Sequence, residues 1–295
     1  MPIFTGSGVA LVTPFDNDGV NYEVFGRLID FQLQNKTDAI IVAGTTGEGS
    51  TIAEDEYGEL LAYAVNRVGG RVPVIAGTGC NNTKRAARLM KIAEGCGADA
   101  ALAVTPYYNK ATQKGLLAYY QALLDAADMP LLAYNVPTRT GVNIQPATAL
   151  ELSKLGVAGL KEANASIEQI MELFRVCADR LDVFDIYSGC DEYVFPMLAL
   201  GARGVISVMA NVIPAQTHDM VAHFMAGETA LSRAEQYKYY PLIKALFLEV
   251  NPIPVKKALE LMGFAAGIPR PPLTELEEGH IGALLAELRK LELIS

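Results

Sequence analysis

The chain has 295 residues, of which 51% are hydrophobic and 19% are charged, a balance that excludes an intrinsically disordered chain. Lys and Arg total 24 against 33 Asp and Glu, and the net charge of -9 argues against nucleic acid or an anionic membrane as the main partner. No apolar run approaches the roughly 18–20 residues that a membrane span needs, and residues 1–13 lack the features of a signal peptide. We therefore expect a cytoplasmic globular protein.

Cysteine and histidine usage supports that expectation. The four cysteines form no C-x-x-C pair and are scattered along the chain: Cys80, Cys96, Cys177 and Cys190. We predict that all four are reduced and structural, because a chain of this length needs no disulfides to fold. His218 and His223 are five residues apart, which does not place them on one helical face, so no metal site is expected.

Short apolar runs recur along the chain with helical patterns between them. The eight candidate strands are residues 9–13, 39–43, 72–76, 100–105, 130–134, 157–161, 184–188 and 204–208. Most are separated by about 27–34 residues, the length of one βα unit. The runs are continuous rather than alternating, which is typical of parallel strands buried on both faces. Eight such units predict an α/β protein with a (β/α)8 TIM barrel, the alternative being an open doubly wound sheet.

After about Gly227 the strand pattern stops and helical patterns take over. Helices are predicted over residues 230–250, 254–262 and 278–293, with a Gly- and Pro-rich connector over residues 263–272. We therefore divide the chain into a catalytic barrel, residues 1–227, and a C-terminal helical region, residues 228–295.

In a barrel, side chains at the carboxyl ends of the strands converge on one mouth. Lys161 ends the sixth predicted strand, directly after the apolar run Val157-Ala158-Gly159-Leu160. Burial there would lower the pKa of its amine and leave a neutral nucleophile for a carbonyl, as in Schiff-base enzymes. The alternative is a lysine that reaches out to solvent from a strand end.

Other residues at the same mouth suit that chemistry. Tyr134 ends the neighbouring strand and can act as acid or base; the alternative is a tyrosine half-buried at the barrel rim. Arg139 follows in a loop bounded by Pro and Gly, where a guanidinium suits a carboxylate; the alternative is a surface arginine. Residues 44–49 form a glycine-rich loop that can bind an anion but lacks the pattern of a nucleotide-binding loop.

Several motifs resemble one family of enzymes. Gly44-Thr45-Thr46-Gly47-Glu48, Tyr134-Asn135-Val136-Pro137 and Lys161 resemble the pyruvate-dependent class I lyases of the dihydrodipicolinate synthase / N-acetylneuraminate lyase family. Residues 11–15, 204–207 and 251–256 fit the same family, so the resemblance covers essentially the whole chain. Thr138-Arg139-Thr140-Gly141 is similar to the synthase branch, whereas sialate lyases generally lack the arginine.

The resemblance implies a reaction and a catalytic set. Synthase-branch enzymes condense pyruvate with L-aspartate 4-semialdehyde on the route to diaminopimelate and lysine. Lys161 would form the imine with pyruvate, and Tyr134 would move protons through the Thr45 hydroxyl to Tyr108 of a neighbouring subunit. A homotetramer, as a dimer of dimers, is implied, with neither a metal nor an organic cofactor. The alternatives are an aldolase for 2-keto-3-deoxy sugar acids or N-acetylneuraminate, and a non-catalytic metabolite-binding protein.

The resemblance also assigns substrate contacts. Thr46 would hold the pyruvate carboxylate and Arg139 the semialdehyde carboxylate. Gly189 and the carbonyl of Ile206 would line the substrate pocket.

One departure from the family concerns regulation. In lysine-inhibited members, a histidine matches Tyr57 and a glutamate matches Arg85, near the dimer interface. Here Arg85 would put a cation where the ammonium of lysine needs an anion. We therefore predict weak or absent feedback inhibition by lysine.

Overall fold

The computed structural model describes residues 2–17 and 19–295. Within these residues, eight parallel strands close into a barrel, in the order β1-β10-β9-β8-β7-β6-β5-β4. The barrel strands are β1 (Gly6–Ala10), β4 (Ala39–Val42), β5 (Val74–Gly77), β6 (Ala100–Val104), β7 (Leu131–Asn135), β8 (Gly159–Glu162), β9 (Asp185–Ser188) and β10 (Gly204–Ser207). The predicted TIM barrel is confirmed, and the open sheet is excluded.

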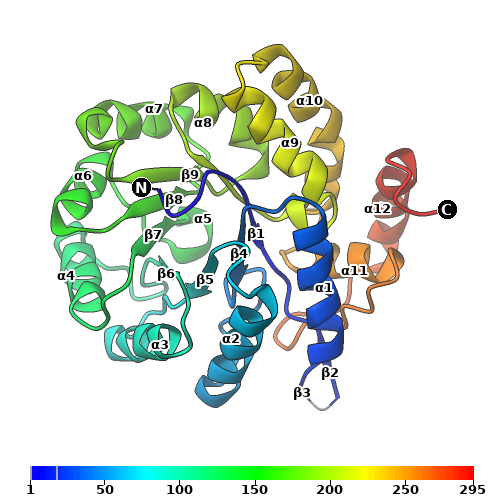
Figure 1. Ribbon diagram of the computed structural model, residues 1–295, viewed down its shortest axis with the longest axis horizontal. Helices are drawn as coiled ribbons and strands as arrows, with labels where there is room; N and C mark the ends of the chain where they lie inside the picture. The colour runs from blue at the N-terminus through cyan, green and yellow to red at the C-terminus, as the bar shows by residue number, and fades with distance from the viewer. Residues whose placement is uncertain (1, 18) are drawn as a thin grey trace.

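Helices surround the strands, as Figure 1 shows. The barrel helices are α1 (Tyr22–Gln34), α2 (Glu54–Val68), α3 (Thr83–Gly95), α4 (Gln113–Leu124), α6 (Pro146–Leu155), α7 (Ile167–Val176), α8 (Val194–Leu200) and α9 (Pro214–Met225). Shorter elements are the hairpin β2 (Phe15–Asp16) and β3 (Gly19–Val20), the turn of helix α5 (Pro137–Thr140), and the 3-10 turns η1 (Ala178–Arg180), η2 (Asp191–Tyr193) and η3 (Met209–Asn211). In the part of the chain described here, no helix is both long and apolar enough to cross a membrane.

The core has two layers, because each barrel strand is buried on both faces. One set of side chains fills the barrel interior, where Phe4 stacks on Tyr187 with ring centroids 4.4 Å apart. A larger set packs between the strands and the surrounding helices. This double burial explains why the strands read as continuous apolar runs.

The first strand begins earlier than its sequence predicts. β1 spans Gly6–Ala10 and pairs Gly6 with Gly204 of β10, whereas residues 9–13 were expected. An added Cβ on Gly204 would lie 1.8 Å from the Gly6 carbonyl oxygen, so the strand start needs glycine. Glycine is a poor strand former, and this hid the start of β1 from the sequence pattern.

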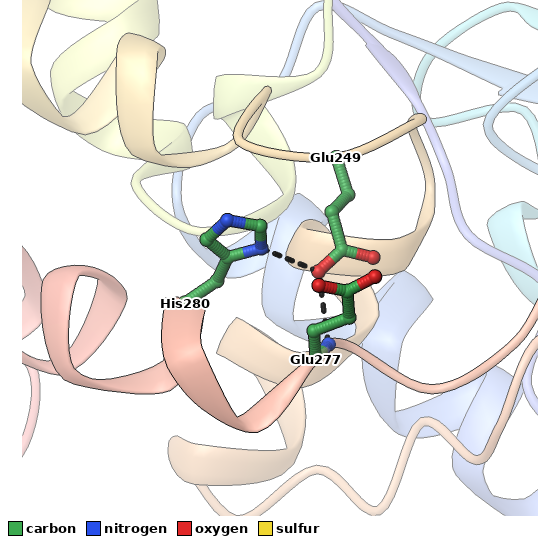
Figure 2. Close-up of side chains that lie close together, drawn as sticks. All are labelled: Glu249, Glu277 and His280. Carbon is green, nitrogen blue, oxygen red and sulfur yellow. Dashed lines mark hydrogen bonds and ion pairs between the residues drawn. The ribbon is translucent and has the colours of Figure 1, made fainter.

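The C-terminal region contains α10 (Thr229–Ala245), α11 (Ile253–Leu261) and α12 (Glu278–Lys290), close to the predicted helices except that α10 ends before residue 250. Glu249, in the connection after α10, forms hydrogen bonds with the start of α12 (Figure 2). Its Oε1 accepts hydrogen bonds from the Glu277 backbone N–H at 2.9 Å and from His280 Nδ1 at 2.7 Å. These three side chains are also close enough to hold a metal ion, but the two hydrogen bonds already explain their arrangement.

Candidate active site

A cavity of about 290 Å³ opens at the carboxyl ends of the barrel strands. Thr45 after β4, Tyr134 on β7, Arg139 after β7 and Lys161 on β8 all line it. The predicted convergence of these four side chains is therefore found in the structure. It follows from the parallel barrel, in which every strand delivers its last residues to the same end.

Lys161 is held in an environment that favours a neutral amine. Its exposed fraction is 5%, so it does not reach out to solvent. Burial, aided by the nearby Arg139 cation, lowers the pKa of Lys161 to about 8, although Cys190 and Asp191 oppose the shift. Its Nζ lies 4.4 Å from the centroid of the Tyr134 ring. The amine is thus buried, partly deprotonated near neutral pH and beside a hydroxyl-bearing side chain.

Tyr134 is placed beside Lys161 by the strand register, which pairs the two residues directly across β7 and β8. Burial raises the pKa of Tyr134 to about 12, against the opposing influence of the Arg139 cation and of a hydrogen bond with Thr45. The hydroxyl therefore keeps its proton near neutral pH. Tyr134 thus hydrogen-bonds with Thr45 while its ring lies beside the Lys161 amine, and hydroxyl groups so placed are suited to proton transfer.

Tyr108 lies outside this arrangement. It follows β6 in a turn, with a φ of 75° and 88% of its surface exposed. It does not line the cavity of its own chain. The predicted link between Tyr108 of a neighbouring subunit and Thr45 stays a prediction.

Arg139 and Thr46 are the two residues predicted to bind carboxylates, and only Arg139 lines the cavity. The Arg139 NH2 donates to the Asn251 carbonyl oxygen at 3.4 Å. Thr46 is buried and does not line the cavity wall. Its Oγ1 accepts a hydrogen bond from Asn251 Nδ2 at 3.0 Å, which leaves the hydroxyl able to donate, and its predicted role as a carboxylate receptor stays a prediction.

Gly189 and Ile206 lie close to the site rather than on its wall. An added Cβ on Gly189 would lie 3.1 Å from Lys161 Cε, so glycine leaves room for the lysine side chain. Ile206 on β10 is buried in the barrel interior. Their predicted role as pocket residues stays a prediction.

Sequence reasoning missed three charged residues around the site. Glu162 follows Lys161 and is buried. Its carboxylate accepts two hydrogen bonds, one from Asn135 Nδ2 at 2.9 Å and one from the Asn164 backbone N–H at 2.6 Å. Burial raises the pKa of Glu162 to about 7. Glu48 and Lys256 form a buried ion pair of 2.7 Å between the 44–49 loop and α11. The available signal was a charged residue beside or inside an apolar or glycine-rich run, the pattern that identifies Lys161 but was not applied to these three residues.

Of the two residues in the predicted regulatory departure, Arg85 lines the cavity and Tyr57 does not. Arg85, at the start of α3, lies 3.5 Å from Glu54 through its Nε. Tyr57 is buried, and its hydroxyl has no hydrogen-bond partner within the described ranges. Arg85 thus brings a cation, paired with Glu54, to the cavity, and the predicted loss of lysine inhibition stays a prediction.

Comparisons with known proteins agree with this geometry. A sequence model described as the Dihydrodipicolinate synthetase family matches residues 3–291. A "4-hydroxy-tetrahydrodipicolinate synthase" of Lachnoclostridium phytofermentans is 53% identical over 297 residues, covering 100% of both chains. A crystal structure of dihydrodipicolinate synthase from Thermotoga maritima superposes with a TM-score of 0.96 at 43% identity, covering 99% of this chain and 100% of that one. A chloride-inhibited dihydrodipicolinate synthase from Acinetobacter baumannii, complexed with pyruvate, gives a TM-score of 0.94 at 38% identity, covering 98% and 99%. The chain belongs to the dihydrodipicolinate synthetase family.

Proposed function

We propose that this protein is a lyase that condenses pyruvate with L-aspartate 4-semialdehyde to give 4-hydroxy-tetrahydrodipicolinate, through an imine on Lys161. The observation that carries the proposal is the buried Lys161 amine, whose pKa is lowered to about 8 at the end of a cavity that also presents Tyr134 and Thr45. The name and near-complete coverage of the Lachnoclostridium relative support the same reaction.

The chemistry follows from these groups. The neutral Lys161 amine attacks C2 of pyruvate, and the carbinolamine loses water when Tyr134 delivers a proton to the leaving hydroxyl. The positively charged imine makes the pyruvate methyl group acidic, and loss of a proton gives an enamine. The enamine carbon attacks the aldehyde and forms the new C–C bond. The amino group of the semialdehyde then displaces Lys161 from the imine carbon, which closes the ring and frees the enzyme.

Arg139 selects the second substrate in this proposal. Its guanidinium lines the same cavity as Lys161 and is anchored to the chain by the Asn251 carbonyl. A planar cation in this position suits the carboxylate of the semialdehyde. Thr46 receives the carboxylate of pyruvate. The imine nitrogen serves as the electron sink, so the reaction as proposed needs no metal or organic cofactor.

The proposal includes an assembly. Thr45 and Tyr134 end inside the cavity, while Tyr108 is exposed on its own chain in a left-handed conformation. A neighbouring subunit that inserts its Tyr108 would complete the proton path, which is why we propose a homotetramer built from such pairs. A cytoplasmic location is proposed from the composition and the cysteine usage alone.

Borohydride reduction in the presence of pyruvate tests the proposal. The reduced adduct is expected on Lys161 by peptide mass mapping, and Lys161→Ala protein should carry none. The wild-type protein should then consume pyruvate and semialdehyde together and should not cleave a 2-keto-3-deoxy sugar acid. An adduct elsewhere, or sugar-acid cleavage without condensation, would show that the proposal is wrong.

A further inference from the structure

The segment 251–256 lies outside the barrel, yet it contacts the loop that carries Thr45 and Thr46. Lys256 on α11 donates from its Nζ to Glu48 Oε1 at 2.7 Å, and the two side chains are 1% and 2% exposed. The other carboxylate oxygen of Glu48 accepts from the Arg270 backbone N–H at 2.8 Å. Both oxygens of Glu48 are therefore held by the C-terminal region, 208 and 222 residues away in sequence.

The 44–49 loop adopts a conformation that needs such support. Ala43 and Glu48, on either side of the threonines, have φ values of 53° and 56°, although neither is glycine. Such left-handed residues persist only where the surroundings fix them. The loop also folds back on itself, since the Glu48 N–H donates to the Thr45 carbonyl at 3.1 Å. The position of Glu48 is therefore linked to that of Thr45 through the backbone.

A second contact reaches the same loop from the same segment. Asn251 Nδ2 donates to Thr46 Oγ1 at 3.0 Å, and both residues are buried. Two side chains of one short segment thus hold two positions of the loop. A buried ion pair adds little net stability over a well-packed apolar pair, but it fixes geometry because each charge tolerates few positions.

We propose that Glu48 and Lys256 are positioning residues, whose buried ion pair fixes the 44–49 loop so that Thr45 and Thr46 face a keto acid on Lys161. The inference rests on the proposed function. It makes the C-terminal helical region part of the catalytic apparatus, although none of its side chains needs to touch the reacting atoms.

The test compares Lys256→Met, Glu48→Gln and the double variant E48Q/K256M with the wild-type protein. Each is checked for folding by circular dichroism and thermal unfolding, and for imine formation by borohydride trapping with pyruvate. We expect the double variant to fold, because no buried charge is left unpaired. Its KM for pyruvate should rise roughly tenfold or more, with a matching loss of trapping rate, because small displacements of positioning groups are costly. The KM for the semialdehyde should stay within about twofold, because Arg139 is held by the backbone carbonyl of Asn251, which neither substitution removes.

Glu249→Ala is the matched control. It removes the hydrogen bonds from Glu277 and His280 within the same C-terminal region, and these do not involve the 44–49 loop. It should lower the unfolding temperature and leave the KM for pyruvate unchanged. A folded double variant with wild-type pyruvate kinetics would overturn the inference. So would a double variant that cannot fold, because the pair would then determine folding rather than position the loop. Absence of trapping in the wild-type protein would instead refute the proposed function.

Discussion

The lowered pKa of Lys161 makes a prediction that can be worked out in numbers. Burial holds this pKa near 8 rather than at 10.5. At pH 7 about one amine in ten is then neutral, against about one in three thousand for an ordinary lysine, a gain of roughly 300-fold. We expect the rate of imine formation with pyruvate to rise about tenfold between pH 6 and pH 7, and to level off above about pH 8.

The same shift has a cost in stability, and its sign can be stated. The unfolded chain keeps the Lys161 proton up to pH 10.5, whereas the folded chain loses it near pH 8. Stability therefore rises with pH through that window, and below pH 8 the full penalty applies, about 3 kcal/mol. Lys161→Met should raise the free energy of unfolding at pH 7 by up to about 3 kcal/mol, and this gain should shrink towards pH 10.5.

Rapid mixing followed by borohydride quenching between pH 6 and pH 10 measures how the rate of imine formation depends on pH. Urea denaturation at pH 7 and pH 10 measures the free energy of unfolding of wild-type and Lys161→Met protein. Glu162→Gln is the necessary control, because burial brings the pKa of Glu162 to about 7 and it would titrate in the same range. If the control keeps the plateau above pH 8, the titration belongs to Lys161. A rate that climbs steadily to pH 10, together with a Lys161→Met variant no more stable than wild type, would refute the reasoning.

Three further predictions follow from the site. Tyr108→Phe should lower kcat by roughly 100-fold or more with an unchanged circular dichroism spectrum, because a proton path loses its outer link; wild-type turnover would remove Tyr108 from the mechanism. Arg139→Ala should raise the KM for the semialdehyde at least tenfold while borohydride still traps pyruvate on Lys161, and equal loss for both substrates would contradict its assignment. Lysine below millimolar concentration should not inhibit the purified enzyme, because Arg85 repels its ammonium group; Arg85→Glu is the variant in which inhibition should appear.

The barrel and the joint position of Tyr134 and Lys161 were predictable from local patterns. Each strand is a short apolar run, and the recurring length of one βα unit is sufficient to predict a closed parallel barrel. That topology alone sends Tyr134 and Lys161 to one mouth, which the register between β7 and β8 confirms. The strand limits were less accurate where glycine replaces side chains, as at Gly6 in β1. There the strand is defined by a close backbone approach that leaves no trace in an apolar pattern.

The position of Tyr108 illustrates a different limit. The sequence alone does not distinguish Tyr108 from Tyr134. Tyr108 follows one barrel strand and Tyr134 ends another, so both are expected near the same mouth. The structure separates them: Tyr134 is 7% exposed and Tyr108 is 88% exposed. Only the family resemblance suggested a use for an exposed tyrosine, because no spacing rule predicts a residue that would act in another subunit.

Glu48 and Lys256 show why the remaining part of the site escaped prediction. A glutamate in a glycine-rich loop and a lysine in a helix are each ordinary surface residues by composition, and most such residues are exposed. The two residues form a buried ion pair only when α11 folds against the barrel and excludes water from both charges. Unpaired, either charge would be costly to bury, so the two positions constrain each other across the whole barrel. Both residues lie in segments already marked by the family resemblance, 44–48 and 251–256, and what singles them out is a charge inside a glycine-rich or apolar segment, the criterion that also identifies Lys161.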